Sequence, residues 1–251
     1  MEIPLFPLHT VLCPGIVLPL HIFEDRYRAL TRHCLDTGAP FGVVLIRDGH
    51  EVGAGDTLTL AGVGAMVEIR KAGRYPDGRF DLLAAATGRF AIDAVDPARE
   101  PYLIADVTPL EDEVGDEARA ERLAATAVRK FIRYLGLMRT RDGETNETLD
   151  IQVEIDDDRD PGEDIADVSE VTEVGDHRDL AIPDDPTVLS YLLSGITQIE
   201  LPRRQALLEA ATTTERLEAL ISLLDRELFL LSNRLRLFAP DQTQMRGSRR
   251  S

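Results

Sequence analysis

The sequence is poor in several residue types that large classes of proteins require. It contains no tryptophan and only two cysteines, Cys13 and Cys34, among 251 residues. A secreted disulfide framework of this size needs more cysteines, so we expect a reducing compartment. No apolar run approaches the about 20 residues of a membrane-spanning helix, and the amino terminus lacks the pattern of a signal peptide. These features predict a cytoplasmic protein that does not bind a membrane.

Basic residues are scarce relative to acidic ones. Lys and Arg number 28 against 45 Asp and Glu, which gives a formal net charge of −17. A strongly negative field repels phosphate backbones, so nucleic acid is not expected as a partner. The excess is concentrated between Asp142 and Asp179, where 16 residues are acidic and two are basic. Self-repulsion predicts that residues 141–180 form an acidic, mostly disordered insertion, with a short edge strand at 148–155.

The usual motifs of nucleotide-binding and hydrolytic enzymes are missing. Neither lysine precedes Ser or Thr, as a phosphate-binding loop would require, and the first serine of the chain is Ser169. Thiol and imidazole groups that could bind zinc or form a nucleophile occur at His9, Cys13, His21 and Cys34. No C-x-x-C or H-x-x-x-H pair fixes two of them locally. Cys13 stands in an apolar run, so we interpret it as a buried thiol. No cofactor is expected.

Short apolar runs separated by glycine and proline fill the first 110 residues and predict strands. Pro-Asp-Gly at 76–78 predicts a hairpin between two of these runs. One interruption, at 23–35, has apolar residues at helical spacing and predicts a single inserted helix. The predicted strands include residues 16–20, 42–46, 57–60, 65–69, 80–84, 89–92 and 103–107.

The apolar residues adopt helical spacing after Asp116, which indicates a C-terminal α-helical bundle. The predicted helices run from there to about Gly136, from the N-cap Asp185 to about Ser194, from Pro202 to Ala211, and onward from a capping box of Thr212 and Glu215. The expected divisions are a β-rich part at 1–112, a connecting helix at 113–140, the insertion at 141–180, the bundle at 181–238 and a flexible tail at 239–251.

The opening of the chain carries a long proline-rich pattern. It reads IPLFPL at 3–8, VLCPG at 11–15 and LPLHIFEDRY at 18–27. Further pieces follow in order: FGVVL at 41–45, VG at 63–64, TGRF at 87–90, PYL at 101–103, QALLE at 205–209 and ERL at 215–217. This pattern resembles the Lon protease N-terminal substrate-binding domain family. The resemblance covers nearly the whole chain except 142–179.

The resemblance implies both a fold and a function. The implied fold is α+β, with a PUA-like β-barrel N-terminal half that contains one inserted helix, followed by a C-terminal α-helical bundle. The implied function is that of a non-enzymatic polypeptide-binding module linked to protein quality control or proteolysis. Its expected partners are unfolded or exposed polypeptide segments, and a protease or chaperone is a further candidate. The ATPase and Ser-Lys protease domains of full-length Lon proteases do not follow Leu235, so we expect a stand-alone member.

The resemblance also draws attention to particular residues of the opening. The candidate polypeptide contacts are Leu20, Phe23 and Tyr27, for each of which core packing is the simpler alternative. The residues expected to shape the backbone, by stopping strands, allowing a bend or bracing the helix start, are Pro7, Pro14, Gly15, Pro19, Glu24 and Arg26. The alternative that remains open is a metalloprotein or thiol enzyme that uses the region of His9, Cys13, His21 and Cys34.

Overall fold

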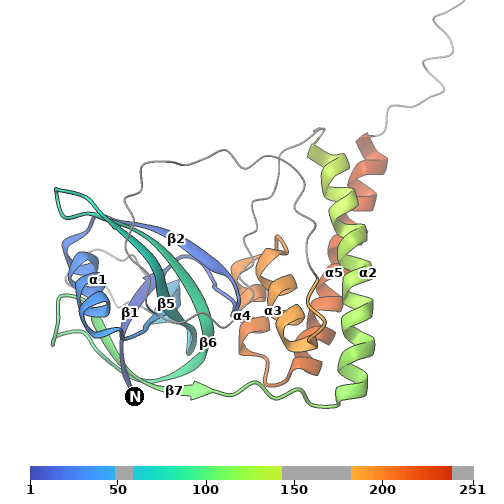
Figure 1. Ribbon diagram of the computed structural model, residues 1–251. Helices are drawn as coiled ribbons and strands as arrows, with labels where there is room; N and C mark the ends of the chain where they lie inside the picture. The colour runs from blue at the N-terminus through green and yellow to red at the C-terminus, as the bar shows by residue number, and fades with distance from the viewer. Residues whose placement is uncertain (49–58, 143–181, 239–251) are drawn as a thin grey trace, which may run out of the picture.

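A computed structural model describes residues 1–48, 59–142 and 182–238 of the protein. The strands and the first helix gather in one half of the molecule, the strand half, and the other helices form the helical half (Figure 1). The strand half comprises β1 (Glu2–Leu8), β2 (Val17–Ile22), α1 (Asp25–Thr37), β3 (Phe41–Asp48), β4 (Thr59–Leu60), β5 (Val63–Arg74), β6 (Phe80–Asp96) and β7 (Leu103–Leu110). The helical half comprises α2 (Glu117–Asp142), α3 (Pro186–Ile196), α4 (Leu201–Glu209) and α5 (Thr213–Phe238).

The seven strands form one mixed sheet whose pairings return to their start. The strands neighbour one another in the order β1-β7-β6-β5-β3-β4, and β2 pairs with β6. β1 runs antiparallel to β7 and also pairs in parallel with β3, in the register Leu5↔Gly42 to Leu8↔Leu45. The path from β1 through β7, β6, β5 and β3 therefore leads back to β1.

Prolines of the opening motif lie inside strands, contrary to the expectation that they stop strand continuation. Pro4 and Pro7 belong to β1, and Pro19 belongs to β2. β1 is paired with β7 at Pro4 and with β3 at Pro7, while β6 is the one partner of β2 among the described strands. A strand with one neighbour tolerates a residue that lacks an N–H group. Pro14 and Gly15 lie between β1 and β2, and the φ of 81° at Gly15 confirms the bend expected there.

The inserted helix and the hairpin predicted from the sequence are both present. Helix α1 buries Tyr27 and Leu30 and ends at Gly38, whose φ of 67° is typical of a helix C-terminus. The β5–β6 hairpin turns at residues 75–79, where Gly78 has a φ of 85°. Only glycine adopts this backbone conformation at little cost, so the Asp-Gly pair was a sound indication of a turn.

The helical half agrees with the predicted starts of its helices better than with their ends. The carboxylate of Asp185 accepts hydrogen bonds from two N–H groups of the first turn of α3, which confirms the N-cap. The hydroxyl of Thr212 accepts from the N–H of Glu215 at 3.1 Å, although the Glu215 carboxylate accepts from Ala211 and not from Thr212. The expected helix end near Gly136 is wrong, because Gly136 does not leave the helical conformation and α2 continues to Asp142.

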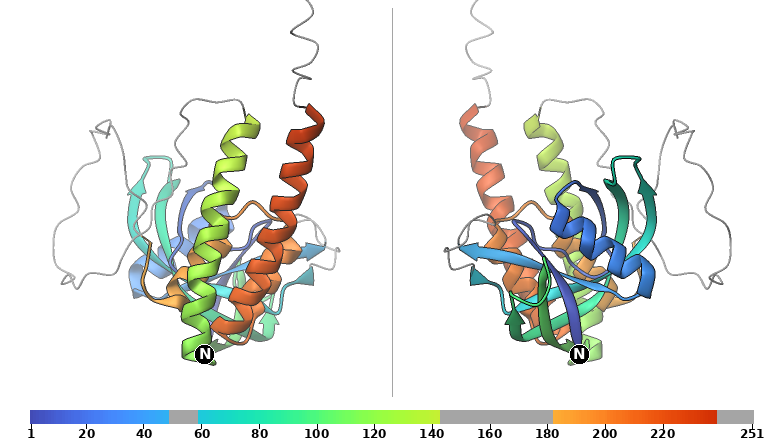
Figure 2. Two further views of the ribbon diagram at one scale, coloured as in Figure 1. Left: turned by 90° about the vertical axis from the view of Figure 1, so that its right-hand side faces the viewer. Right: turned by 90° about the vertical axis from the view of Figure 1, so that its left-hand side faces the viewer.

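Three clusters of buried side chains hold the molecule together. One lies between α1 and the sheet, and a second lies between α2 and α5, which run side by side (Figure 2). The third bridges the halves, because Tyr191 of α3 and Leu208 of α4 pack with Leu5, Val44 and Phe90 of the strands. No described helix is long and apolar enough to cross a membrane. Most of the predicted acidic insertion, its edge strand at 148–155 and the tail at 239–251 lie outside the described residues.

Candidate functional site: an exposed row of rings and a buried joint

The three candidate polypeptide contacts differ in exposure. Phe23, directly after β2, is 62% exposed, whereas Leu20 is half-buried against the strand-half core. Tyr27 is only 4% exposed, and its ring stacks on Phe6 with 4.0 Å between the ring centroids. The guanidinium carbon of Arg26 lies 4.5 Å from the same ring. This packing removes the ring from the surface and favours the alternative of core packing for Tyr27.

Phe23 stands at one end of a row of exposed rings. The His21 ring is stacked with Phe23 at a centroid distance of 6.3 Å and meets the Tyr75 ring edge-on at 6.1 Å. The Asp81 carboxylate lies 2.6 Å from Nδ1 of His21 and accepts a hydrogen bond of 2.5 Å from the Tyr75 hydroxyl. The guanidinium carbon of Arg79 lies 5.4 Å from the Tyr75 ring centroid. We call these five residues the ring surface.

The sheet register brings the ring surface together. His21 of β2 is the direct partner of Asp81 of β6, and the β5–β6 hairpin places Tyr75 and Arg79 beside them. Hydrogen bonds from Tyr75 and His21 lower the pKa of the Asp81 carboxyl, and the same carboxylate raises the pKa of Tyr75. The polar groups thus satisfy one another, which leaves the ring of Phe23 as the apolar part of the surface.

Glu24 and Arg26, expected to brace the start of α1, contact each other. The Nε of Arg26 donates to Glu24 at 3.0 Å, and an Nη atom lies 2.9 Å from the same carboxylate oxygen. Glu24 precedes the helix, but its side chain accepts no hydrogen bond from the first turn. The pair therefore stabilises the segment around Tyr27 without capping the helix.

The residues of the metal or thiol alternative do not form a site. Cys13 and Cys34 are free and buried in different core clusters, His21 is paired with Asp81, and His9 is exposed. Burial raises the pKa of both thiols to about 11, which keeps them protonated. In the part of the chain that the structure describes, no three His, Cys, Asp or Glu residues gather as metal ligands. The alternative is therefore not supported.

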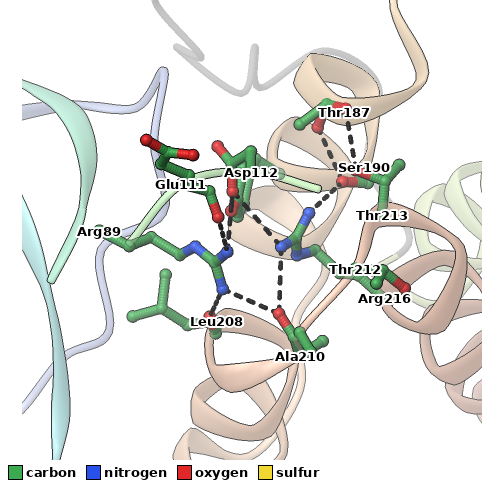
Figure 3. A network of polar contacts seen from close by, with 12 residues as sticks. Arg89, Glu111, Asp112, Thr187, Ser190, Leu208, Ala210, Thr212, Thr213 and Arg216 are labelled. Atoms are coloured by element: carbon green, nitrogen blue, oxygen red, sulfur yellow. Dashed lines mark hydrogen bonds and ion pairs between the residues drawn. The ribbon is translucent and has the colours of Figure 1, made fainter. Parts of the chain in front are cut away.

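A buried polar network, absent from the sequence-based predictions, connects the two halves (Figure 3). Arg89 of β6 is 4% exposed and Arg216 of α5 is fully buried. Both face Asp112, whose carboxylate lies 2.9 Å from Arg89 and 3.8 Å from Arg216. The Tyr191 hydroxyl donates to the same carboxylate, and the guanidinium carbon of Arg216 lies 3.7 Å from the Tyr191 ring centroid. We call Arg89, Asp112, Tyr191 and Arg216 the joint.

The two guanidiniums also bind carbonyl groups at the C-terminal end of α4. Arg89 donates to the carbonyl oxygens of Leu208 and Ala210 at 2.9 and 2.8 Å, and Arg216 donates to that of Leu207 at 3.1 Å. These carbonyls lack partners within the helix and form the negative end of its dipole, so cations are favoured there. Burial lowers the pKa of Arg216 and raises that of Tyr191, because each charged form loses its contact with water.

Several sequence pieces that carry the resemblance meet at this joint. Arg89 belongs to the TGRF piece and Arg216 to the ERL piece. In the QALLE piece, the side-chain amide of Gln205 donates to the carbonyl oxygen of Val63 at 2.9 Å, and the Glu209 carboxylate lies 2.7 Å from Arg47. The pieces that carry the resemblance could have indicated that distant segments contact each other, but they do not show which residues form the contacts.

Comparisons with known proteins agree with the resemblance found in the sequence. The model of the ATP-dependent protease La (LON) substrate-binding domain matches residues 2–226. The Lon protease of Escherichia coli K12 is 24% identical over all of this chain, which covers 28% of that protease. Lon protease 2 of Myxococcus xanthus is 26% identical over 93% of this chain, which covers 25% of that protein. The chain thus spans about a quarter of the length of these relatives.

Two solved structures share the fold. A Lon N-terminal domain protein from Xanthomonas campestris has a TM-score of 0.54 and 23% identity, and the match covers 88% of this chain and 98% of that one. The N-terminal domain of the Mycobacterium avium complex Lon protease also has a TM-score of 0.54, with 19% identity over 90% of this chain and 98% of that one. By its sequence pattern and the extent of the family match, the chain belongs to the Lon substrate-binding domain family.

Proposed function

We propose that this protein is a non-enzymatic module that recognises exposed apolar segments of unfolded polypeptides through its ring surface. The observation that carries the proposal is the position of Phe23, which belongs to the opening motif of a substrate-binding family and is 62% exposed. A cytoplasmic location and cooperation with a protease or chaperone complete the proposal. Membership of the family and its link to proteolysis support that cooperation.

The chemistry of the ring surface suits a target of variable sequence. An exposed phenylalanine ring gains free energy from contact with any apolar side chain, because the hydrophobic effect depends on area and not on direction. The polar groups beside it, His21, Arg79 and Asp81, bond to one another and so demand no fixed polar partner. The buried, protonated thiols of Cys13 and Cys34 supply no nucleophile, which supports a binding role.

The finer description of the fold is part of the same proposal. The strand path that returns to β1 supports a PUA-like barrel, since closing a sheet on itself is the defining feature of a barrel. The shared core of α2, α3, α4 and α5 supports a helical bundle. A barrel would hold the end of β2 and the β5–β6 hairpin rigidly, and the ring surface would then be largely formed before a polypeptide binds.

The proposal is tested with a labelled, reduced and carboxymethylated polypeptide that stays unfolded. Its fluorescence anisotropy is titrated with this protein at physiological salt, with a folded protein of similar size as the negative control. Phe23→Ala should weaken binding about tenfold, which is about 1.4 kcal/mol and less than the value of a fully buried phenylalanine ring. The matched control is Phe229→Ala, because Phe229 is 67% exposed on α5, in the other half of the molecule.

Equal affinities of the wild type and Phe23→Ala, in a protein that is still folded, would rule out the ring surface as the contact. Equal losses of affinity in Phe23→Ala and Phe229→Ala would indicate nonspecific hydrophobic binding to exposed rings and would also contradict the proposal. Saturable binding of the folded control with the same affinity would show that the target is not the unfolded chain.

A further inference from the structure

The described connection between the two halves is a short linker, residues 111–116, between β7 and α2. The linker is hydrogen-bonded to the start of α5. The N–H of Thr213 donates to the carbonyl oxygen of Glu113 at 2.8 Å, and Thr214 donates to that of Val114 through its N–H and its hydroxyl. The linker is thus attached to the helical half, and side chains that cross between the halves decide their relative orientation.

Arg89 is a buried charged residue whose side chain extends from the strand half to the helical half. It stands on β6, yet its guanidinium donates to Leu208 and Ala210 of the helical half and to the carbonyl oxygen of Glu111, and it pairs with Asp112. Figure 3 shows the side chain extended from its strand toward the end of α4. Its side chain is 2% exposed, so a change of orientation between the halves would take a buried charge away from its acceptors on Leu208 and Ala210.

The receiving site for Arg89 is held by the helical half itself. Asp112 accepts a hydrogen bond from Tyr191 of α3 and faces Arg216 of α5. Arg216 is fixed in turn by the carbonyl oxygen of Leu207 and by the hydroxyl of Ser190, at 3.1 and 3.0 Å. The acceptors that bind Arg89 are therefore in place whether or not its guanidinium is inserted.

We propose that Arg89 is a latch that sets the orientation of the strand half relative to the helical half. With the latch inserted, the two halves move as one body; without it, they reorient about residues 111–116. The apolar cluster around Leu208 and Phe90 and the hydrogen bond from Gln205 to Val63 keep them in contact but do not fix one angle, because apolar contacts have little directional preference and a single hydrogen bond allows rotation about it. Arg89 fixes the angle between the two halves, since a planar guanidinium binds its acceptors in a fixed geometry.

A second arginine offers a matched control. Arg47 of β3 also crosses to the helical half, where it pairs with Glu209 of α4 at 2.7 Å. Its side chain is 50% exposed and that of Glu209 is 33% exposed, so water and salt weaken the pair. Arg47 and Arg89 thus have the same residue type and the same direction of crossing, and differ in burial.

The test measures distances between spin labels by pulsed electron resonance. Labels are attached at Asp36→Cys on α1 and Ile132→Cys on α2, both exposed positions, while Cys13 and Cys34 are buried and protected. The parent protein and the Arg47→Met variant should each give one narrow distance distribution. Arg89→Met should broaden the distribution at least twofold, and calorimetry should show two unfolding transitions in place of one.

A distribution in Arg89→Met as narrow as in Arg47→Met, together with a single unfolding transition, would overturn the latch. Equal broadening in both variants would overturn it as well, because burial would then make no difference. If Arg89→Met does not fold, Arg89→Lys is compared with Arg47→Lys, since lysine keeps the charge but loses the planar geometry. None of these measurements uses polypeptide binding, so the latch and the proposed function fail or succeed separately.

Discussion

Replacing Gly64 by alanine should destabilise the protein more than any other exchange of glycine for alanine in its strands. Gly64 lies on β5 against the buried ring of Phe90. A Cβ atom at this position would lie 2.5 Å from Cζ of Phe90 and 2.7 Å from the carbonyl oxygen of Val43. Real Cβ atoms do not approach other heavy atoms this closely, so the sheet or the ring has to move. The carbonyl belongs to the backbone of β3 and has no rotamer to change.

The size of the effect follows from overpacking. Inserting a methyl group into a well-packed core costs about 1–3 kcal/mol, and the backbone clash with Val43 places Gly64→Ala at about 3 kcal/mol. A change of this size lowers the melting temperature of a chain of about 250 residues by roughly 6–12 °C. Gly88→Ala is the control, because a Cβ on this neighbouring strand would meet nothing within 4 Å.

The assay is urea unfolding of single and double variants, followed by circular dichroism. Phe90→Leu should partly rescue Gly42→Ala, because the three atoms nearest to a Cβ at Gly42 belong to the side chains of Phe90 and Leu5. The same change should rescue Gly64→Ala less, since the contact with Val43 remains. An equal loss in Gly64→Ala and Gly88→Ala would refute the reasoning, and so would full rescue of Gly64→Ala by Phe90→Leu.

Two further predictions concern the helix cap and the buried thiols. Asp185→Ala should lower the free energy of unfolding by about 1 kcal/mol, because the Asp185 carboxylate accepts a hydrogen bond from the N–H of Thr187 at 2.7 Å. Urea unfolding measures this change, and the control Asp184→Ala should change the free energy of unfolding by no more than about 0.5 kcal/mol. Folding raises the pKa of Cys13 and Cys34 from 9.0 to about 11, so the folded chain binds more protons between these values and stability should fall as pH rises from 9 to 11. Replacing both thiols by alanine should flatten that part of the pH profile of stability, and an unchanged slope would contradict the assignment.

Local features of the fold were accessible from the sequence where one short segment decides the structure. The hairpin at 76–78 and the N-cap at Asp185 depend on residues a few positions apart, and both were predicted. β1 was not among the predicted strands, because Pro4 and Pro7 argue against a strand unless its neighbours are known. The runs at 80–84 and 89–92 likewise belong to the single strand β6, whose continuity depends on pairing with β2, β5 and β7.

The candidate site was also predictable only in part. Phe23 was selected from the motif and is exposed, whereas Tyr27, four residues later, is covered by Phe6. The helical spacing of Tyr27, Leu30 and Cys34 places Tyr27 on the face of α1 that packs on the sheet, so this spacing favoured core packing over a polypeptide contact. The ring surface also needs Tyr75 and Asp81, which come from a hairpin about 60 residues away and carry no local signal.

The joint shows why a family pattern is easier to find than to explain. Arg89 and its acceptor Leu208 are separated by 119 residues, and Gln205 and its acceptor Val63 by 142. Both acceptors are backbone carbonyls, which every residue possesses, so the receiving side leaves no trace in the sequence. A buried arginine such as Arg89, whose acceptors are backbone atoms except for Asp112, looks like an ordinary surface charge until the fold is known. The latch assignment implies that part of the resemblance to Lon substrate-binding domains reflects the need to hold two halves at one angle, and not direct contact with a substrate.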